Sequence, residues 1–167
     1  MFFDYFNFIK TYYRKRLQVN YFSGEYDCKV DAKGRMVLPS KIKAKLPESH
    51  NKEVGVTWGL DPCLVVYAMP EWNKKVAKVS SLNENDGDDV RVFQRNFFSR
   101  SQELDLDGNG RLLLPKSMVR YAGIEKEVII VGVGNKIEMW NPERYEKYLL
   151  NGSEEYSDLA KKFLGNE

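Results

Sequence analysis

The chain has 167 residues, of which 43% are hydrophobic and 30% are charged, and its formal net charge at pH 7 is +2. A chain of this length and composition can bury a hydrophobic core, either as one domain or as two small ones. The small net charge excludes a bulk polycation that binds acidic partners through overall charge alone.

Residues 1–20 combine an apolar, aromatic run, interrupted by Asp4, with a basic cluster at Arg14, Lys15 and Arg16. The run is too short to span a membrane, and the basic cluster follows it, which is the reverse of a secretory signal peptide. Three interpretations stay open: a disordered or loosely packed tail, an arm that contacts a membrane surface or nucleic acid, and residues that are not made because translation starts downstream. Val19 is well placed for such a start.

The first ordered feature is a hairpin around Asp31-Ala-Lys-Gly-Arg35, between expected strands at residues 25–30 and 35–38. Asp31 suits a tight turn because its carboxylate accepts bonds from the backbone ahead, and Gly34 suits the positive-φ position. Arg35 then falls at the hairpin tip, where we expect Asp31 to hold its guanidinium in a fixed direction.

The rest of the first half alternates short helices and strands. A helix is expected over residues 39–46, with Lys41 and Lys43 among its polar positions, and it is followed by a loop that holds His50. Strands are expected at residues 54–58 and 64–67. A further helix begins at Pro70, a residue that suits the first turn, and runs to about residue 79.

The second half repeats this plan after a polar, acidic linker at residues 80–89. Asp107-Gly-Asn-Gly-Arg111 repeats the first turn, 76 residues further on, with Gly110 in the place of Gly34. Apolar spacing predicts helices at residues 88–98 and 154–164. The last of these helices packs either on its own domain or on a neighbouring subunit. The other expected elements are strands at residues 103–106, 111–114, 128–133 and 136–140 and helices at residues 115–122 and from Pro142.

The chain is therefore predicted to be a duplicated unit of the α+β class, mainly β. Each copy of roughly 50 residues is marginal as a separate core, so we expect the two copies to interleave around a pseudo-twofold axis. The predicted organisation is an N-terminal extension of unknown role (1–20), a first repeat (21–79), a linker and helix (80–98), a second repeat (99–150) and a C-terminal helix and tail (151–167).

Nothing positive in the sequence indicates an enzyme, a cofactor or a metal site. Cys28 and Cys63 are far apart and are interpreted as small buried residues in a reducing compartment, not as a redox or metal pair. His50 has no visible partner. Asp31 and Asp107 each have an arginine nearby, which is expected to lower the carboxyl pKa and make them orienting groups rather than general acids.

Arg35 and Arg111 favour binding instead. A guanidinium held at a hairpin tip can make bidentate contacts to guanine or phosphate. Lys33, Lys41 and Lys43, expected near the first tip, would neutralise backbone phosphates. On the residues alone, a purely structural Asp–Arg pair across each turn remains the competing interpretation.

Several segments, in the same order, resemble the MraZ family from about Tyr21 to the end of the chain. They are Tyr21-Phe-Ser-Gly-Glu-Tyr26, Asp31-Ala-Lys-Gly-Arg35, Pro62-Cys-Leu-Val-Val-Tyr67, Met69-Pro-Glu-Trp72, Tyr121-Ala-Gly-Ile-Glu-Lys-Glu-Val128 and Val131-Gly-Val-Gly-Asn-Lys-Ile-Glu-Met-Trp140. Residues 1–20 have no counterpart in the family.

The resemblance implies a bacterial transcriptional regulator of the division and cell-wall gene cluster, usually a repressor, without a cofactor. It implies tandem AbrB-like swapped-hairpin units, a ring-shaped homo-oligomer and binding of double-stranded DNA at tandem repeats in its own promoter, with Arg35 and Arg111 as DNA contacts. The expected location is the cytoplasm, on the nucleoid, with no membrane partner. Two alternatives are an assembly or interaction module that has lost DNA binding and an unrecognised enzyme.

Overall fold

The computed structural model describes residues 21–48 and 52–165, so the expectations for residues 1–20 and for His50 fall outside the described residues. The strands are β1 (Glu25–Lys29), β2 (Arg35–Val37), β3 (Val54–Trp58), β4 (Leu64–Ala68), β5 (Ser101–Leu104), β6 (Arg111–Leu113), β7 (Glu127–Val133) and β8 (Lys136–Trp140). The helices are α2 (Ser40–Lys43), α3 (Met69–Ser80), the 3-10 turn η2 (Glu84–Asp86), α4 (Asp88–Ser99), α5 (Lys116–Ala122), α6 (Pro142–Glu146) and α7 (Ser153–Leu164). This composition confirms the α+β class.

The two copies exchange strands with each other. A six-stranded antiparallel sheet runs in the order β1-β7-β8-β4-β3-β5, and β2 and β6 form a separate two-stranded ribbon. Strand β1 of the first copy therefore pairs with β7 of the second, and β5 of the second pairs with β3 of the first. Neither copy holds a complete sheet, so the predicted interleaving is present in the strand pairing.

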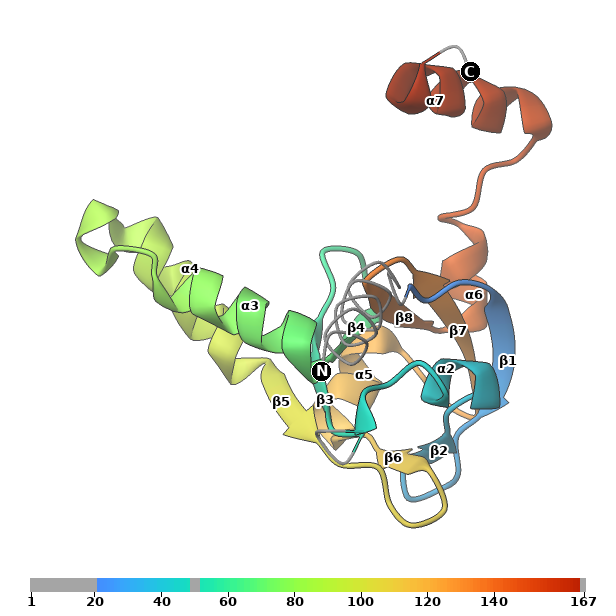
Figure 1. Ribbon diagram of the computed structural model, residues 1–167, viewed down its shortest axis with the longest axis horizontal. Coiled ribbons are helices and arrows are strands. Elements are labelled where there is room, and N and C mark those ends of the chain that lie inside the picture. Colours follow the sequence, from blue (N-terminus) through green and yellow to red (C-terminus); the bar gives the residue numbers. More distant parts are fainter. Residues whose placement is uncertain (1–20, 49–51, 166–167) are drawn as a thin grey trace, which may run out of the picture.

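The ribbon lies on the pseudo-twofold axis. Met36 of β2 pairs with Leu112 of β6, and these residues hold equivalent positions in the two copies of the turn motif. On either side, Arg35 lies opposite Leu113 and Val37 lies opposite Arg111. The axis therefore passes between Met36 and Leu112, and it relates the two hairpin tips at the lower edge of Figure 1.

One hydrophobic core serves both copies. Because side chains alternate between the two faces of a strand, Val54 and Val56 of β3 and Ile130 of β7 point inward. They belong to one cluster of buried residues with Met36, which is 1% exposed, and Leu112, which is 0% exposed. The ribbon thus closes over the concave face of the sheet.

The outer face of the sheet carries a second cluster and a helical hairpin. Helices α3 and α4 project together from the barrel, as Figure 1 shows, with η2 at their far end. Trp72 of α3 stacks on Phe97 of α4 with ring centroids 5.7 Å apart. Gln94 donates to the carbonyl of Val79 at 3.0 Å. The stretch expected to be a plain linker is therefore the bend of this hairpin.

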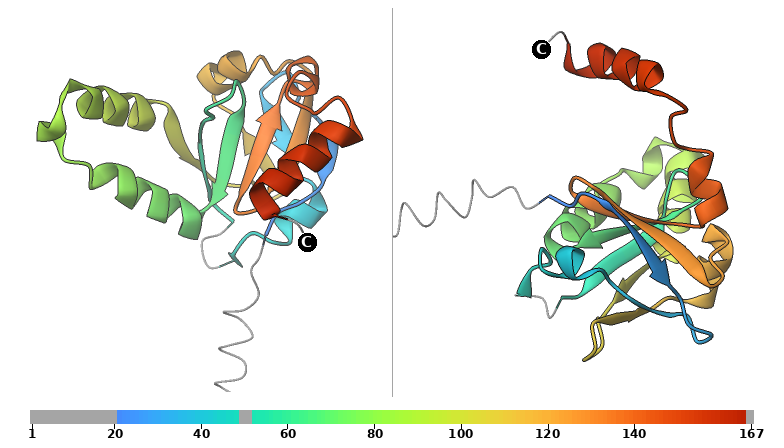
Figure 2. Two further views of the ribbon diagram at one scale, coloured as in Figure 1. Left: turned by 90° about the horizontal axis from the view of Figure 1, so that it is seen from above. Right: turned by 90° about the vertical axis from the view of Figure 1, so that its right-hand side faces the viewer.

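Two other expectations need correction, and one pair of alternatives is narrowed. The first strand of the second copy spans Ser101–Leu104, earlier than expected, because Ser101 pairs with Thr57 of β3. Helix α2 contains only Ser40–Lys43, although Leu46 is buried as expected. Of the two alternatives for α7, packing on its own domain is not seen: the helix buries no residue, and it stands clear of the barrel in the right view of Figure 2.

Leu112 and Leu113 give a test of the shared core. Replacing the buried Leu112 by alanine should lower the free energy of unfolding by about 2–5 kcal/mol, because a cavity opens between the two copies. Replacing its exposed neighbour Leu113 should change it by no more than about 0.5 kcal/mol. Urea unfolding, followed by circular dichroism and tryptophan fluorescence, should give one transition for both signals. Separate transitions, or equal losses for the two variants, would contradict a single core.

Candidate nucleic-acid interface

At the first hairpin tip, a single carboxylate fixes both the turn and the arginine. One oxygen of Asp31 accepts the backbone N–H groups of Lys33 and Arg35, each at 2.9 Å. The other oxygen accepts Nε of Arg35 at 2.7 Å. Only Nε of the guanidinium is engaged by the carboxylate, so the two terminal nitrogens remain for a further ligand.

The second tip repeats this geometry almost atom for atom. Asp107 accepts the backbone N–H groups of Asn109 and Arg111 at 2.9 and 3.0 Å and Nε of Arg111 at 2.7 Å. At both tips, one aspartate therefore binds the turn backbone and the Nε of the arginine.

Both carboxylates have a lowered pKa. The largest cause of the lowered pKa is a hydrogen bond from a backbone N–H group, which Arg35 donates to Asp31 and Arg111 donates to Asp107. The guanidinium of the same arginine lowers the pKa further. The expected direction is confirmed, although the guanidinium is not the main cause. A lowered pKa keeps both carboxylates ionised at neutral pH, and any stability that these bonds provide is lost only as the pH falls through the lowered pKa.

The glycines of the turns connect each tip to the other copy. Gly34 and Gly110 have φ values of +83° and +70°, which residues other than glycine rarely adopt. The carbonyl of Gly34 accepts the N–H of Leu114 at 2.9 Å, and that of Gly110 accepts the N–H of Leu38 at 3.4 Å. Each tip is therefore held in place by the end of the other copy's ribbon strand.

Both arginines emerge on the outward face of the ribbon. Met36 and Leu112 point into the core, so the alternation of a strand places Arg35, Val37, Arg111 and Leu113 outside. Arg35 and Arg111 are diagonal cross-strand neighbours, a relation that places residues roughly 7–8 Å apart. The structure thus brings together two arginines that are 76 residues apart in the sequence.

The predicted lysines divide between the two tips. Lys33 is exposed at the first tip, and Lys41 is exposed on α2. Lys43 lies at the second tip, where a β-carbon on Gly110 would come within 2.6 Å of its Nζ. The expectation that Lys43 lies near the first tip is therefore wrong. The reason is the strand exchange, because α2 follows β2, whose far end meets the tip of the second copy.

Other cations, which the sequence reasoning missed, lie beside the tips. An open hollow next to Lys33 of the first tip is also lined by Lys116 and Arg120 of α5. The corresponding hollow at the second tip is lined by Lys52, which was also missed, together with the predicted Lys43. The signal that could have found them is the predicted interleaving itself, since it places the helix of each copy beside the tip of the other.

The described ranges give no support for metal or redox chemistry. No group of His, Cys, Asp or Glu side chains suited to a metal ion occurs in residues 21–48 and 52–165. Cys63 is buried, as expected, and burial raises the pKa of its thiol to about 12. Cys28 is only partly buried, and burial raises its pKa as well. Within the same ranges, no helix is long and apolar enough to span a membrane.

Known proteins share this sequence pattern over most of its length. Residues 21–96 and 97–165 each match the family described as "MraZ protein, putative antitoxin-like". A transcriptional regulator MraZ of Cytophaga hutchinsonii is 49% identical over 146 residues, which are 87% of this chain and 96% of that protein.

Two further relatives carry the same name. The protein of Acetivibrio thermocellus is 43% identical over 76% of this chain and 85% of its own length. That of Christiangramia forsetii is 38% identical over 86% of this chain and 93% of its own length. The family is thus one of transcriptional regulators and not of enzymes. On these matches, the chain belongs to the MraZ family.

Proposed function

We propose that this chain is a sequence-specific, double-stranded-DNA-binding transcriptional regulator, and that its DNA-reading surface is the β2–β6 ribbon with its two tips. It acts in the cytoplasm, on the nucleoid, as a repressor of the division and cell-wall gene cluster that includes its own promoter. It assembles as a ring-shaped homo-oligomer on tandem repeats, with AbrB-like swapped hairpins as its DNA-binding units.

The observation that carries the proposal is the pair of arginines on the outward face of the ribbon. The major groove of DNA admits a two-stranded β-ribbon, and arginine is suited to bidentate contact with guanine. Asp31 and Asp107 bind each Nε and do not engage the terminal nitrogens. Ordering Arg35 and Arg111 before binding reduces the entropy lost when they contact a base.

The surrounding cations suit contacts to the DNA backbone. Lys33 and Lys41 are exposed, and Lys43, Lys116 and Arg120 line hollows beside the tips. Such residues neutralise phosphates without reading sequence, and they position the arginines in the groove.

The alternative of an assembly module without DNA binding does not account for the tips. Such a module would need the aspartates and glycines to form the turns, but it would not need an arginine held by the aspartate at both tips. The repetition of this pair in two copies favours DNA.

Replacing Arg35 or Arg111 by alanine should weaken promoter binding by about 1–3 kcal/mol each, if each makes a bidentate base contact. The fold should survive because both side chains lie on the surface. The measurement is a gel-shift titration, at one fixed salt concentration, with the DNA upstream of the chain's own gene.

Arg95→Ala is the matched control for these variants. It removes the same charge from an exposed position on α4, away from the ribbon, so promoter affinity should stay close to wild type. If both single variants and the double variant bind as tightly as wild type, the ribbon is not the reading surface and the assembly-module alternative gains support.

Lys116 and Arg120 should act on the DNA backbone. Replacing both by alanine should weaken binding to promoter and unrelated DNA by similar factors. The slope of log affinity against log salt should fall by about 1 for each phosphate that the variant no longer neutralises. The charge-matched control is the double variant Lys78→Ala, Arg95→Ala on the helical hairpin. Weaker binding to promoter DNA alone would assign the pair a base-reading role instead.

Binding should also depend strongly on the number of repeats. A single three-residue ribbon covers little DNA, whereas a ring that engages several repeats gains effective concentration, a gain that can reach about 10²–10⁴-fold. Shortening the DNA from several repeats to one should therefore lose far more affinity than the count of sites predicts. Equal affinity for one repeat and for several would contradict multivalent binding.

A further inference from the structure

Helix α7 presents an apolar face that nothing in the described chain covers. The face consists of Tyr156, Leu159, Ala160, Phe163 and Leu164, which recur at helical spacing. Tyr156 and Phe163 are 67% and 73% exposed. An isolated helix of 12 residues is marginal in water, so α7 needs a packing partner for stability.

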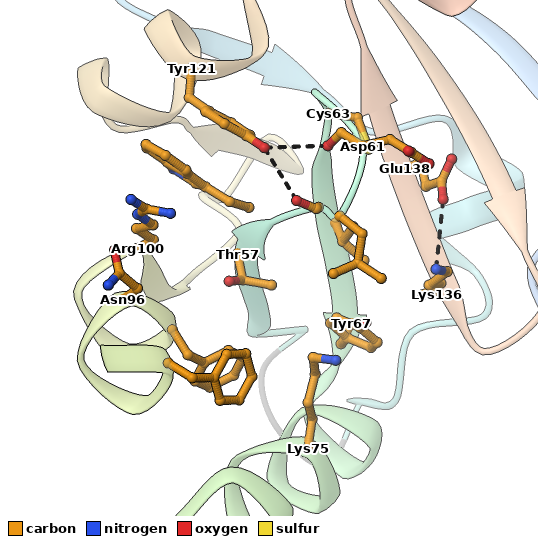
Figure 3. Close-up of a pocket in the computed structure, with 16 residues that line it drawn as sticks. Thr57, Asp61, Cys63, Tyr67, Lys75, Asn96, Arg100, Tyr121, Lys136 and Glu138 are labelled. Atoms are coloured by element: carbon orange, nitrogen blue, oxygen red, sulfur yellow. Dashed lines mark hydrogen bonds and ion pairs between the residues drawn. The ribbon is translucent and has the colours of Figure 1, made fainter. Parts of the chain in front are cut away.

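The barrel carries a groove of matching character, which we call the aromatic groove. It has a volume of about 390 Å³ and lies between α4, α5 and the β3–β4 turn, as Figure 3 shows. Its apolar lining includes Trp58, Leu60, Phe93 and Tyr121, and Leu60 is fully exposed at its rim.

One wall of the aromatic groove is fixed in advance. Trp58 and Tyr121 stack with ring centroids 3.6 Å apart, and the guanidinium of Arg100 lies 4.2 Å from the Trp58 centroid. The Tyr121 hydroxyl donates to the carbonyl of Gly59 at 3.2 Å, which ties α5 to the β3–β4 turn. A preformed wall of this kind costs little conformational entropy when a partner packs against it.

The acidic first half of α7 complements the cations of the groove, whereas its last turn carries Lys161 and Lys162. The first half of α7 carries Glu154, Glu155 and Asp158. Lys75 and Arg100 line the groove, and within the described ranges neither has an ion-pair partner: Lys75 lies over the Tyr67 ring and Arg100 over Trp58. The remaining charged lining is Asp61 together with Lys136, which pairs with Glu138 at 3.7 Å.

The position of α7 indicates which groove it fills. The chain leaves the barrel after α6, where Tyr145 and Tyr148 pack on Trp140, with ring centroids 5.8 and 4.9 Å from its centroid. From there α7 extends away from the barrel, on the side opposite to the α3–α4 hairpin in the left view of Figure 2. The helix therefore does not lie over α4, α5 and the β3–β4 turn, whose residues line the groove.

We propose that α7 of one copy packs its apolar face into the aromatic groove of the next copy. Two unlike surfaces on one chain make a head-to-tail contact, which closes into a ring when the rotation between neighbours allows. One helix covers a small interface, so a single contact is weak and the closed ring gains from having many. This inference rests on the ring assembly proposed above and names the surfaces that form it.

The first test uses the mass of the full chain in solution, measured by light scattering after gel filtration. The α7 variant Leu159→Ser, Phe163→Ser and the groove variant Leu60→Asp should each fall from the oligomer to the monomer. Leu82→Ser is the matched control, because Leu82 and Leu159 are 39% and 38% exposed but only Leu159 belongs to the apolar face of α7. All these positions are exposed, so the fold should survive, as circular dichroism would verify.

Mixing the two deficient variants gives the decisive result. The groove variant keeps an intact α7, and the α7 variant keeps an intact groove, so an equimolar mixture should form a one-to-one heterodimer and no ring. Variants that keep the wild-type mass would overturn the proposal. So would a mixture that forms no heterodimer even at a high protein concentration, where a weak single contact is populated, since α7 would then fill its own groove or bind another protein.

A DNA measurement separates this proposal from the proposed function. The α7 variant should bind a single repeat as tightly as wild type and should lose the gain from several repeats. If wild type assembles through α7 but binds no promoter DNA, the interface stands and the DNA-binding function fails. If the α7 variant still forms rings and binds DNA, the function stands and this interface is wrong.

Discussion

The pairing of β2 with β6 across the pseudo-twofold axis is the interaction on which the rest of the structure depends. Each of these strands has three residues, and an isolated ribbon of that size is unstable in water. It persists because Met36 and Leu112 are buried in the core that both copies share. The carbonyls of Gly34 and Gly110 also accept N–H groups from the opposite copy. Each aspartate orients the arginine of its own copy, but the placement of both arginines on one ribbon is a property of the duplicated chain.

The duplication has kept the chemistry of the turns but not their surroundings. Each tip has its aspartate and arginine, whereas Lys33 at the first tip corresponds to Asn109 at the second. Glu125 lines the first hollow beside its cations, whereas no glutamate of the described residues lines the second hollow. The two halves of the ribbon thus carry different charge.

Local chemistry is what the sequence could predict. The aspartate and glycine of each turn, the prolines before α2 and α5, and the alternation of the strands are determined within a few residues, and the structure contains all of them. Placing the lysines required knowing which strand meets which tip, and that depends on register across the two copies. The acidic stretch after α3 was expected to be a linker because its polarity is visible locally. Two contacts make this stretch a hairpin bend: Trp72 packs on Phe97, and Gln94 donates to Val79. Neither contact is visible in the local sequence.

The surfaces proposed for DNA and for assembly lie on different parts of the molecule, which removes a conflict between the two roles. The ribbon is at one edge of the barrel in Figure 1, the α3–α4 hairpin projects to the side, and α7 emerges opposite the ribbon. Packing α7 into a neighbour's groove therefore leaves Arg35 and Arg111 uncovered. Residues 147–152 join α6 to α7; Tyr148 packs on Trp140, whereas α7 itself buries no residue. In the proposed ring, this connection would let neighbouring copies adjust their angle. That freedom would let several ribbons, each rigid in itself, meet successive repeats on one DNA duplex.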